Sequence, residues 1–447
     1  MIKLKKGLDI PISGGPSEDF YEANPPRYVA VLGSDYVGMK PTMVVSEGDT
    51  VKLGQTIFID KKIEGVAFTA PGAGKVIAIN RGERRALQSV VIELDESVGA
   101  EEFPAYDRDK LLGLNRQCVV DTLVSSGMWT ALRTRPFSKS PALDSVPHSI
   151  FVTAMDTNPL AANPEDIIWK NPDAWQDGLK VLTNLTEGEL HVCIADGSNI
   201  PMIRKVDIQT FCGPHPAGLA GTHIHFIDPV GPSKSVWYIN YQDVIAIGKL
   251  FTTGQLFTDR YVSLAGPMVK RPRIVKTRLG AGITEIISGE IKDGDARIIS
   301  GSILSGFKAD GPLAYLGRFH NQITAVPEGG KRDFMGWMAP GRDKFSFKPV
   351  FMSAFSKKKK EFDFNTLLGG SHRAIFPTGA FDDVMPMDIL PTYLVRAMAV
   401  MDSDEAQALG CLELDEEDVA LLSFVDCGKN DFGKMLREVL NLIEKEG

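Results

Sequence analysis

The sequence is poor in cysteine and lacks a long apolar run. Its five cysteines are scattered and odd in number, so neither a disulfide framework nor a zinc site is indicated and we expect a reducing compartment; they are Cys118, Cys193, Cys212, Cys411 and Cys427. No window approaches the roughly 18 apolar residues that a membrane-spanning helix needs. The basic N-terminus is not followed by the apolar region of a signal peptide. These absences predict a soluble or peripheral protein.

The sequence also lacks an excess of positive charge. Its 447 residues have a net charge of −8, which argues against a nucleic-acid partner, because binding to phosphate normally requires a basic surface. A Gly-x-Gly-x-x-Gly motif after a strand is missing too, so a dinucleotide site of that type is not supported. With 43% hydrophobic residues, the chain is long enough for three or four domains.

Short apolar segments between glycine-rich turns fill residues 40–100 and predict a compact β domain. The strands are expected at Thr42–Val45, Thr56–Ile59, Val66–Thr69, Lys75–Asn80 and Ser89–Leu94. Their order resembles the barrel-sandwich hybrid of biotinyl and lipoyl carrier domains, in which a lysine at a hairpin tip bears the cofactor. Lys61 stands at the comparable place, although a turn lysine is more often a solvated cation.

Residues 104–255 alternate between helix-like and strand-like segments, which predicts an α/β layer. The apolar strand candidate Ser149–Ala154 is followed by the polar turn Met155–Pro159. Ligands of open α/β sheets tend to bind at the carboxyl ends of strands. This turn is therefore a candidate ligand-binding position.

Three of the seven histidines, His215, His223 and His225, fall within eleven residues. We expect His223 and His225 to share one face of a strand. A metal site would need a further protein ligand, and only Asp228 lies near enough in the sequence to supply one. Hydrogen-bonded imidazoles in a glycine-rich loop are the commoner arrangement, and we expect no metal.

Two further segments complete the predicted architecture. Tyr261–Gly306 reads as two strands, a short helix and a strand, the order of a small β-grasp unit, and the end of the chain is helical by its apolar spacing. Before those helices, Lys357–Lys360 form a basic run beside two phenylalanines, which suits either an anionic lipid surface or a solvated loop. The fold class expected is multidomain α+β; the four parts are an N-terminal region with a barrel-sandwich hybrid (1–103), a Rossmann-like α/β domain (104–255), a β-grasp, SLBB-like domain (256–330) and a C-terminal helical domain (331–447).

The stretch Leu123–Pro141 carries the strongest sign of ligand binding. Aromatic rings alternate there with cations, and Pro136 and Pro141 prevent the helix before them from continuing. Rings stack on a flat, electron-rich ligand while cations stabilise negative charge on its oxygens. A surface loop with solvated arginines and buried rings has the same pattern. The candidate residues, with two added from an earlier loop, are Tyr36, Met39, Trp129, Arg133, Arg135, Phe137 and Lys139.

Seven blocks, in one order along the whole chain, resemble the A subunit of the sodium-translocating NADH:quinone oxidoreductase (Na+-NQR). They are Lys5–Asp9, Tyr36–Met43, Arg135–Lys139, Thr153–Leu160, Gly213–Leu219, Asn240–Val244 and Leu412–Asp418. This family is a peripheral component, facing the cytoplasm, of a six-subunit complex in the bacterial inner membrane. The resemblance implies that the other five subunits are its partners and that ubiquinone is its substrate.

A more distant resemblance concerns cofactors. The domain order is similar to that of the flavin-binding subunit of complex I and of the C subunit of the Rnf complex. These relatives have a glycine-rich flavin loop, and this chain has mostly bulky residues at the corresponding segment, Gly127–Phe137. The Rnf subunit also has two cysteine runs, and near the corresponding segments of this chain the only cysteines are Cys411 and Cys427. The resemblance therefore implies a degenerate ferredoxin-like C-terminal domain without iron–sulfur cluster, no FMN and no covalently bound cofactor. Met385, Met387, Phe376 and Phe381 are the expected fillers of the vacated space.

Two functions remain open at this stage. In one, the chain takes part in ubiquinone binding and in its reduction to ubiquinol, coupled to sodium export by the complex, with the aromatic and basic residues named above forming the site. In the other, it is a structural cap and the quinone site lies in the membrane subunits. In both, the isolated chain is not expected to be catalytic.

Overall fold

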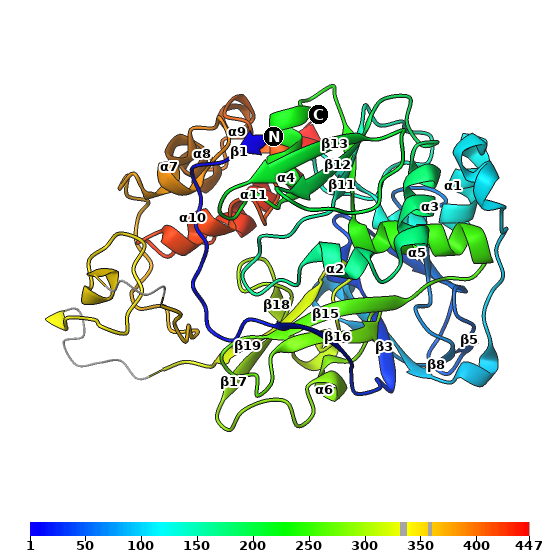
Figure 1. Cartoon of the computed structure of the whole chain (residues 1–447), viewed down its shortest axis with the longest axis horizontal. Coiled ribbons are helices and arrows are strands. Elements are labelled where there is room, and N and C mark those ends of the chain that lie inside the picture. Colours follow the sequence, from blue (N-terminus) through cyan, green and yellow to red (C-terminus); the bar gives the residue numbers. More distant parts are fainter. Residues whose placement is uncertain (331–337, 356–359, 447) are drawn as a thin grey trace.

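The computed structural model describes residues 1–330, 338–355 and 360–446. Figure 1 shows mixed sheets and helices in the body of the molecule, and an irregular lobe followed by a helical region at one end. The predicted multidomain α+β class is confirmed. Among the described residues, no helix has the length and apolarity that crossing a bilayer requires.

The barrel-sandwich part consists of two small sheets. One has the order β3 (Tyr28–Leu32), β9 (Leu87–Leu94), β8 (Gly74–Arg81), β5 (Thr50–Val51), and the other β4 (Pro41–Met43), β6 (Thr56–Asp60), β7 (Ala67–Thr69). The rings of Phe58 and Phe68 stack between paired strands, with centroids 4.6 Å apart. Lys61 directly follows β6 and is exposed, and its backbone N–H donates to Lys40 O. Its modification stays a prediction.

The α/β part is a six-stranded sheet. Its order is β1 (Ile2–Lys3), β13 (Asp207–Cys212), β12 (Leu190–Ala195), β11 (Ile150–Thr153), β14 (Val236–Asn240), β10 (Arg133–Arg135), all parallel except β10. The accompanying helices are α1 (Arg116–Ser125), α2 (Pro164–Ile168), α3 (Pro172–Leu182), α4 (Ala220–Ile227) and α5 (Tyr241–Thr253). Because β12 and β14 lie on opposite sides of β11, the chain reverses its direction of winding there, and a crevice opens at the carboxyl ends of β11 and β14.

The β-grasp part is a second six-stranded sheet. Its order is β18 (Phe307–Lys308), β17 (Ala296–Ser300), β19 (Gln322–Pro327), β15 (Asp259–Ala265), β16 (Arg273–Arg278), β2 (Ser17–Glu22), with α6 (Ile283–Ile286) following β16. The N-terminal segment of the chain thus adds an edge strand to each of the two large sheets, β1 to one and β2 to the other. The expected N-terminal region, 1–103, therefore contributes strands to sheets outside the barrel-sandwich hybrid.

The C-terminal helices enclose a separate apolar core. They are α7 (Ala380–Val384), α8 (Pro391–Ala399), α9 (Ser403–Ala408), α10 (Ala420–Val425) and α11 (Phe432–Glu446). Phe381, Met385 and Met387 are buried in this core. The expectation for Phe376 is wrong: it stands in the irregular segment before α7, and 65% of its surface is exposed. Of the basic run 357–360, only Lys360 lies within the described residues.

Candidate functional site

A cleft of about 370 Å³ lies at the carboxyl ends of β11 and β14. Thr153, Met155 and Asp156 line it from the end of β11, and Ile239 and Asn240 from the end of β14. The turn after β11 is the one that the sequence marked as a ligand-binding position. The β-grasp domain and the residues just before α10 close the other sides, through a set that includes Phe319, His320, Gln322, Asp415 and Glu417. Ser34, Asp35 and Val37 of the N-terminal part also line the cleft, so four parts of the chain meet around one hollow.

Arg133 is the cation that lines the cleft. It begins β10, and its guanidinium carbon lies 4.5 Å from the ring centroid of Tyr238 and 4.2 Å from that of Phe319. Stacking between two rings fixes the plane of a guanidinium group while its N–H groups stay at the rim of the stack. The side chain of Arg133 has no hydrogen bond or ion pair within the described part of the chain. Its five donors are therefore available to a ligand.

The other titratable groups around the cleft are mostly acidic. Burial raises the pKa of Asp156 to about 6, although Asp156 Oδ1 accepts hydrogen bonds from Asn158 N at 2.8 Å and Nδ2 at 2.9 Å. Burial also raises the pKa of Asp35 to about 7. His320 has its pKa lowered to about 4, first by burial and then by the charge of Arg133, so it is neutral near pH 7. The lining described here thus presents one free cation among carboxyl groups.

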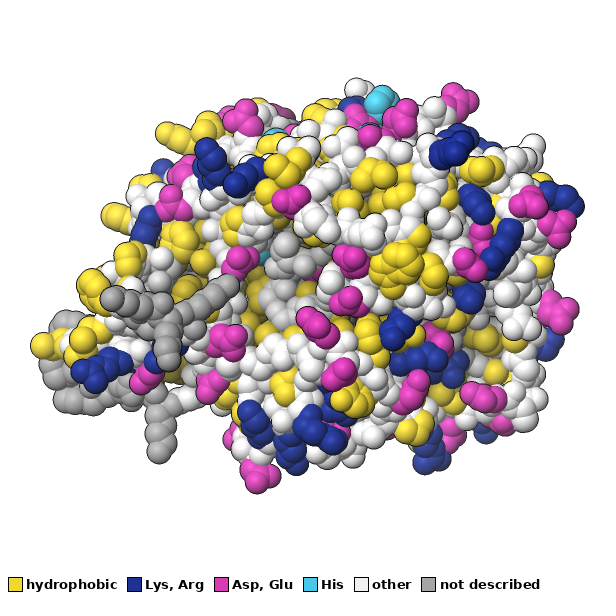
Figure 2. All heavy atoms as spheres, viewed as in Figure 1, with side chains coloured by type: hydrophobic (Ala, Val, Ile, Leu, Met, Phe, Trp, Pro, Cys, Tyr) yellow, Lys and Arg dark blue, Asp and Glu magenta, His cyan; other side chains and the backbone are white. Residues whose placement is uncertain are grey.

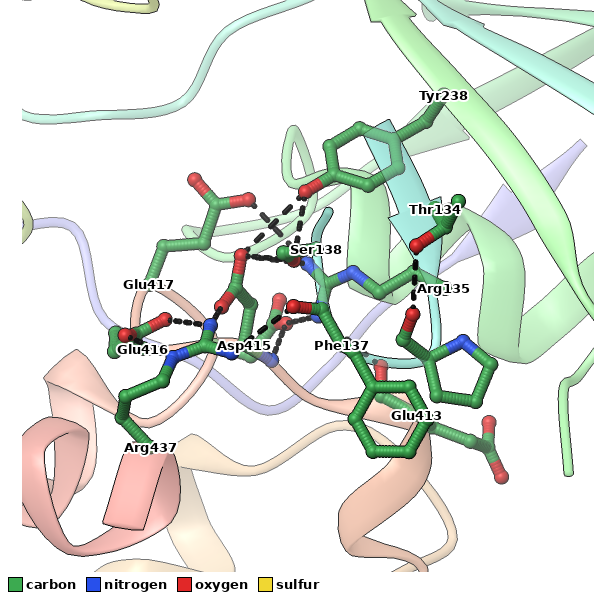
Figure 3. A network of polar contacts seen from close by, with 12 residues as sticks. Thr134, Arg135, Phe137, Ser138, Tyr238, Glu413, Asp415, Glu416, Glu417 and Arg437 are labelled. Carbon is green, nitrogen blue, oxygen red and sulfur yellow. Dashed lines mark hydrogen bonds and ion pairs between the residues drawn. The ribbon is translucent and has the colours of Figure 1, made fainter. Parts of the chain in front are cut away.

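Arg135, two residues along the same strand, lies in different surroundings (Figure 3). Its side chain has no exposed surface and faces three carboxylates, at 3.1 Å from Asp418, 3.6 Å from Glu417 and 3.8 Å from Asp415. Arg135 also donates to Glu413 O at 3.4 Å. These partners precede α10, so the guanidinium ties the α/β sheet to the C-terminal domain.

A second arginine completes this polar network. Arg437 on α11 contacts Asp415 at 2.5 Å and Glu416 at 2.6 Å, and donates to Phe137 O at 3.0 Å. Burial opposes ionisation of Asp415, but Arg135 and Arg437 hold its pKa below the usual range. Burial, together with the neighbouring charge of Asp415, raises the pKa of Glu416. Four carboxyl groups thus share two guanidinium groups at the junction of the two domains.

The structure separates the seven sequence-predicted residues into three groups. Arg133 lines the cleft, and Tyr36 is connected with it through Phe319, whose ring lies 6.2 Å from that of Tyr36. Met39 and Trp129 pack in the main core, where Trp129 is fully buried and its Nε1 donates to Pro141 O at 2.8 Å.

The remaining three residues face the C-terminal domain. Arg135 pairs with the carboxylates before α10, as described above. Phe137 packs against the core of the C-terminal helices. Lys139 pairs with Glu444 of α11. These three side chains therefore connect domains, and the described structure places none of them in the lining of the cleft.

His215, His223 and His225 do not lie on a strand. His223 and His225 belong to helix α4, two residues apart, so they do not share a face, and the expectation of a common strand face is wrong. His223 Nε2 lies 2.9 Å from Ala217 O, and burial lowers its pKa to about 4. His225 Nδ1 lies 2.8 Å from Glu413 Oε2 and its Nε2 accepts from Asp388 N. Within residues 1–330, 338–355 and 360–446, no group of His, Cys, Asp and Glu side chains has the arrangement of a metal site.

The segment 127–131, which the resemblance compares with a flavin loop, is closely packed. Gly127 adopts φ +75°, and a Cβ there would stand 2.3 Å from Thr69 Oγ1, so that the chain packs tightly against β7. Met128, Trp129 and Ala131, which follow in a short 3₁₀ helix, are all buried. Side chains therefore occupy the space that a glycine-rich loop would leave open.

Sequence reasoning missed several residues of the cleft. Tyr238 and Phe319, the rings that hold Arg133, lie more than 80 residues apart in the sequence, and neither stands in a motif. Tyr238 follows an apolar strand pattern typical of a core residue, and it is buried. Asp35, next to the predicted Tyr36, also lines the cleft, and no sequence pattern marked it as a site residue. Apart from Arg133, the part of the cleft with a recognisable local pattern is the turn Met155–Pro159, where polar residues follow a strand.

Comparison with known proteins identifies the family. Three family models match in sequence order: the NqrA N-terminal barrel-sandwich hybrid domain at 2–95, the NqrA second alpha/beta domain at 114–256 and the NQRA C-terminal domain at 261–311. The A subunit of the Na(+)-translocating NADH-quinone reductase of Histophilus somni (strain 2336) is 55% identical over 451 residues, covering 100% of both chains. The chain belongs to this family of A subunits.

Other members of the family are equally similar. The A subunit from Glaesserella parasuis serovar 5 is 56% identical and that from Marinomonas sp. is 55% identical, each over 100% of both chains. Among solved structures, an NAD+-reducing [NiFe]-hydrogenase in the air-oxidized state covers 52% of this chain and 53% of its own, at 9% identity and a TM-score of 0.32. The family assignment therefore rests on the full-length relatives.

Proposed function

We propose that this chain contributes a quinone-binding site to the sodium-translocating NADH:quinone reductase, and that the site is the cleft around Arg133. The observation that carries the proposal is a guanidinium group held between two rings with all of its donors unpaired among the described residues. A quinone carbonyl oxygen is a hydrogen-bond acceptor, and negative charge on that oxygen increases when the ring is reduced. An oriented guanidinium stabilises such charge without having to reorganise.

The charges of the cleft favour an uncharged acceptor over an anionic ligand. Asp35, Asp156, Asp415, Glu416 and Glu417 all line it, against the single free cation of the described lining, Arg133. A phosphate group would meet repulsion from the carboxylates that are ionised. A quinone head is neutral in its oxidised form, so it avoids this cost while it still accepts hydrogen bonds from Arg133.

In this proposal the chain works only within the complex. Electrons from NADH arrive through partner subunits, because the chain itself binds neither FMN nor an iron–sulfur cluster and has no covalently bound cofactor. It associates with the other five subunits as a peripheral component on the cytoplasmic side of the inner membrane. The absence of these cofactors is supported by the buried Met128–Ala131 segment and by the thiols near the C-terminal helices, where Cys411 is buried and Cys427 exposed.

Titration of the purified chain with a water-soluble ubiquinone analogue tests the proposal. We expect saturable binding to the unmodified chain, a loss of affinity in Arg133→Ala, and unchanged affinity in Arg27→Ala, a matched control whose guanidinium carbon lies 5.2 Å from the ring centroid of Tyr28, away from the cleft. Equal affinities of all three proteins, or no binding at all, would overturn it.

A purely structural role as a cap is the second candidate. It is favoured by Arg135 and its carboxylate partners, which join two domains and leave the side chain of Arg135 without exposed surface. If the same titration gives no quinone binding while the complex still assembles with the chain, the structural role is the correct one.

A further inference from the structure

The irregular segment before α7, described at residues 338–355 and 360–376 and called the lobe here, projects from one end of the molecule (Figure 1). Its base is well packed. The ring of Phe345 lies 5.8 Å from Phe362, 5.5 Å from Phe364 and 6.2 Å from Phe424 of α10, and Phe362 N donates to Pro11 O at 2.8 Å. The lobe is therefore attached to the body by its own aromatic cluster.

A second set of apolar side chains in the lobe has no such packing. The exposed fraction is 84% for Phe355 and 76% for Val350, and the whole exposed set is Met338, Val350, Met352, Phe355, Leu368 and Phe376. Figure 2 shows hydrophobic and basic side chains together at the tip of this end of the molecule. Clusters of exposed large apolar residues mark interaction surfaces, because leaving them in water is unfavourable.

The charge of the lobe differs in sign from that of the chain as a whole. The described residues of the lobe, 338–355 and 360–376, have five lysines and arginines against three acidic residues, a net charge of +2, while the whole chain has −8. Within the described residues, the lobe's Arg342 and Arg373 are exposed, and the exposed Lys348 pairs with Asp383 of α7. Positive charge interleaved with exposed apolar side chains complements an anionic lipid surface, which attracts the cations and accepts the apolar groups between its headgroups.

We propose that the lobe docks this chain on the surface of an anionic bilayer, with Val350 and Phe355 inserted among the headgroups and the neighbouring cations at the phosphates. The contact is interfacial, since no described helix has the length and apolarity for a span. It adds a membrane anchor that is independent of the cleft and of its ligand. Lipid is the partner that fits best, because the lobe's net positive charge is opposite in sign to that of the whole chain and is attracted to an anionic headgroup layer.

Sedimentation with lipid vesicles tests this docking on the full chain. We expect the chain to bind vesicles of 30% phosphatidylglycerol in phosphatidylcholine and to lose most of this binding in pure phosphatidylcholine or at high salt. In the double variant Val350→Ser with Phe355→Ser, the partition coefficient is expected to fall at least about tenfold, because the inserted apolar surface is removed.

Val146→Ser with Phe226→Ser is the matched control. It removes the same two residue types from exposed positions elsewhere, with exposed fractions of 53% and 39%, and its binding to the vesicles is expected to stay at the level of the unmodified chain. Thermal unfolding of both variants checks that they fold. The proposal is overturned if the unmodified chain ignores anionic vesicles, or if the two double variants bind them equally. It is also overturned if the lobe variant keeps its vesicle binding but fails to assemble with the other subunits, since the lobe would then dock on protein.

Discussion

Arg133 and Arg135 stand two residues apart on one strand and approach the same ring, at 4.5 Å and 5.1 Å from the centroid of Tyr238. The side chain of Arg133 opens onto a cleft and has no hydrogen-bond partner within the described residues, whereas that of Arg135 has no exposed surface and faces three carboxylates. The first can bind a ligand and the second can only hold the fold. The comparison teaches that one basic motif can supply a ligand-binding residue and an interdomain tie side by side.

Replacing Arg135 by alanine is expected to have the largest effect of all. It leaves Glu417 and Asp418 without their cation and Asp415 with Arg437 alone, which should cost about 3–5 kcal/mol of unfolding free energy. Urea denaturation of the variant and of the unmodified chain measures this cost. A loss below about 1 kcal/mol, the range of an exposed ion pair, would contradict the structural role of Arg135 and remove the contrast with Arg133.

The Arg133→Ala variant should show the reverse pattern. Its unfolding free energy is expected to change little, while quinone affinity falls by about 10- to 100-fold, the value of one or two hydrogen bonds from a charged donor. Arg133→Lys should recover only part of the affinity, because an ammonium group lacks the flat face that stacks between Tyr238 and Phe319. Calorimetric titration measures both. Full affinity in the alanine variant would place the ligand elsewhere.

Asp156 gives a pH-dependent test of the cleft. Its pKa is raised in the folded chain to about 6, so the unfolded chain loses this proton first, and the folded state becomes progressively less stable as the pH rises from about 4 to about 6. Asp156→Asn removes this penalty. Its melting temperature, relative to that of the unmodified chain, should therefore increase from about pH 4 to about pH 6 and then stay constant.

The exposed Asp144 supplies the control for this measurement. Asp144→Asn should run parallel to the unmodified chain over the same pH range. If the melting-temperature difference between Asp156→Asn and the unmodified chain stays constant with pH, burial does not raise the pKa of Asp156, and this part of the account is wrong.

The smallest effect is expected for Lys139→Gln. The side chain of Lys139 retains 17% exposure and pairs with Glu444, whose side chain is 36% exposed, and ion pairs open to water contribute less than about 1 kcal/mol. Quinone affinity should not change, because Lys139 does not line the cleft. A tenfold loss of affinity in this variant would extend the site beyond Arg133 and weaken the comparison.

The sequence predicted the fold better than the site. The turns and apolar spacings of the β strands and terminal helices were local signals; for example, the strand expected at Thr56–Ile59 is β6 (Thr56–Asp60). The site is assembled from four parts of the chain, and no local pattern says that Tyr238 and Phe319 will enclose Arg133. Trp129 was expected to bind a ligand but is buried in the core. The sequence could not tell these roles apart, because an aromatic residue in a basic loop has the same local pattern in both.

Hydrogen–deuterium exchange of the intact chain, with and without a saturating water-soluble quinone, tests the central claim most directly. The account predicts slower exchange at the backbone amides of residues 153–158, 238–240 and 319–322, which surround the cleft, and little change in Met128–Ala131. Protection confined to other segments, or none when the quinone is bound, would contradict it.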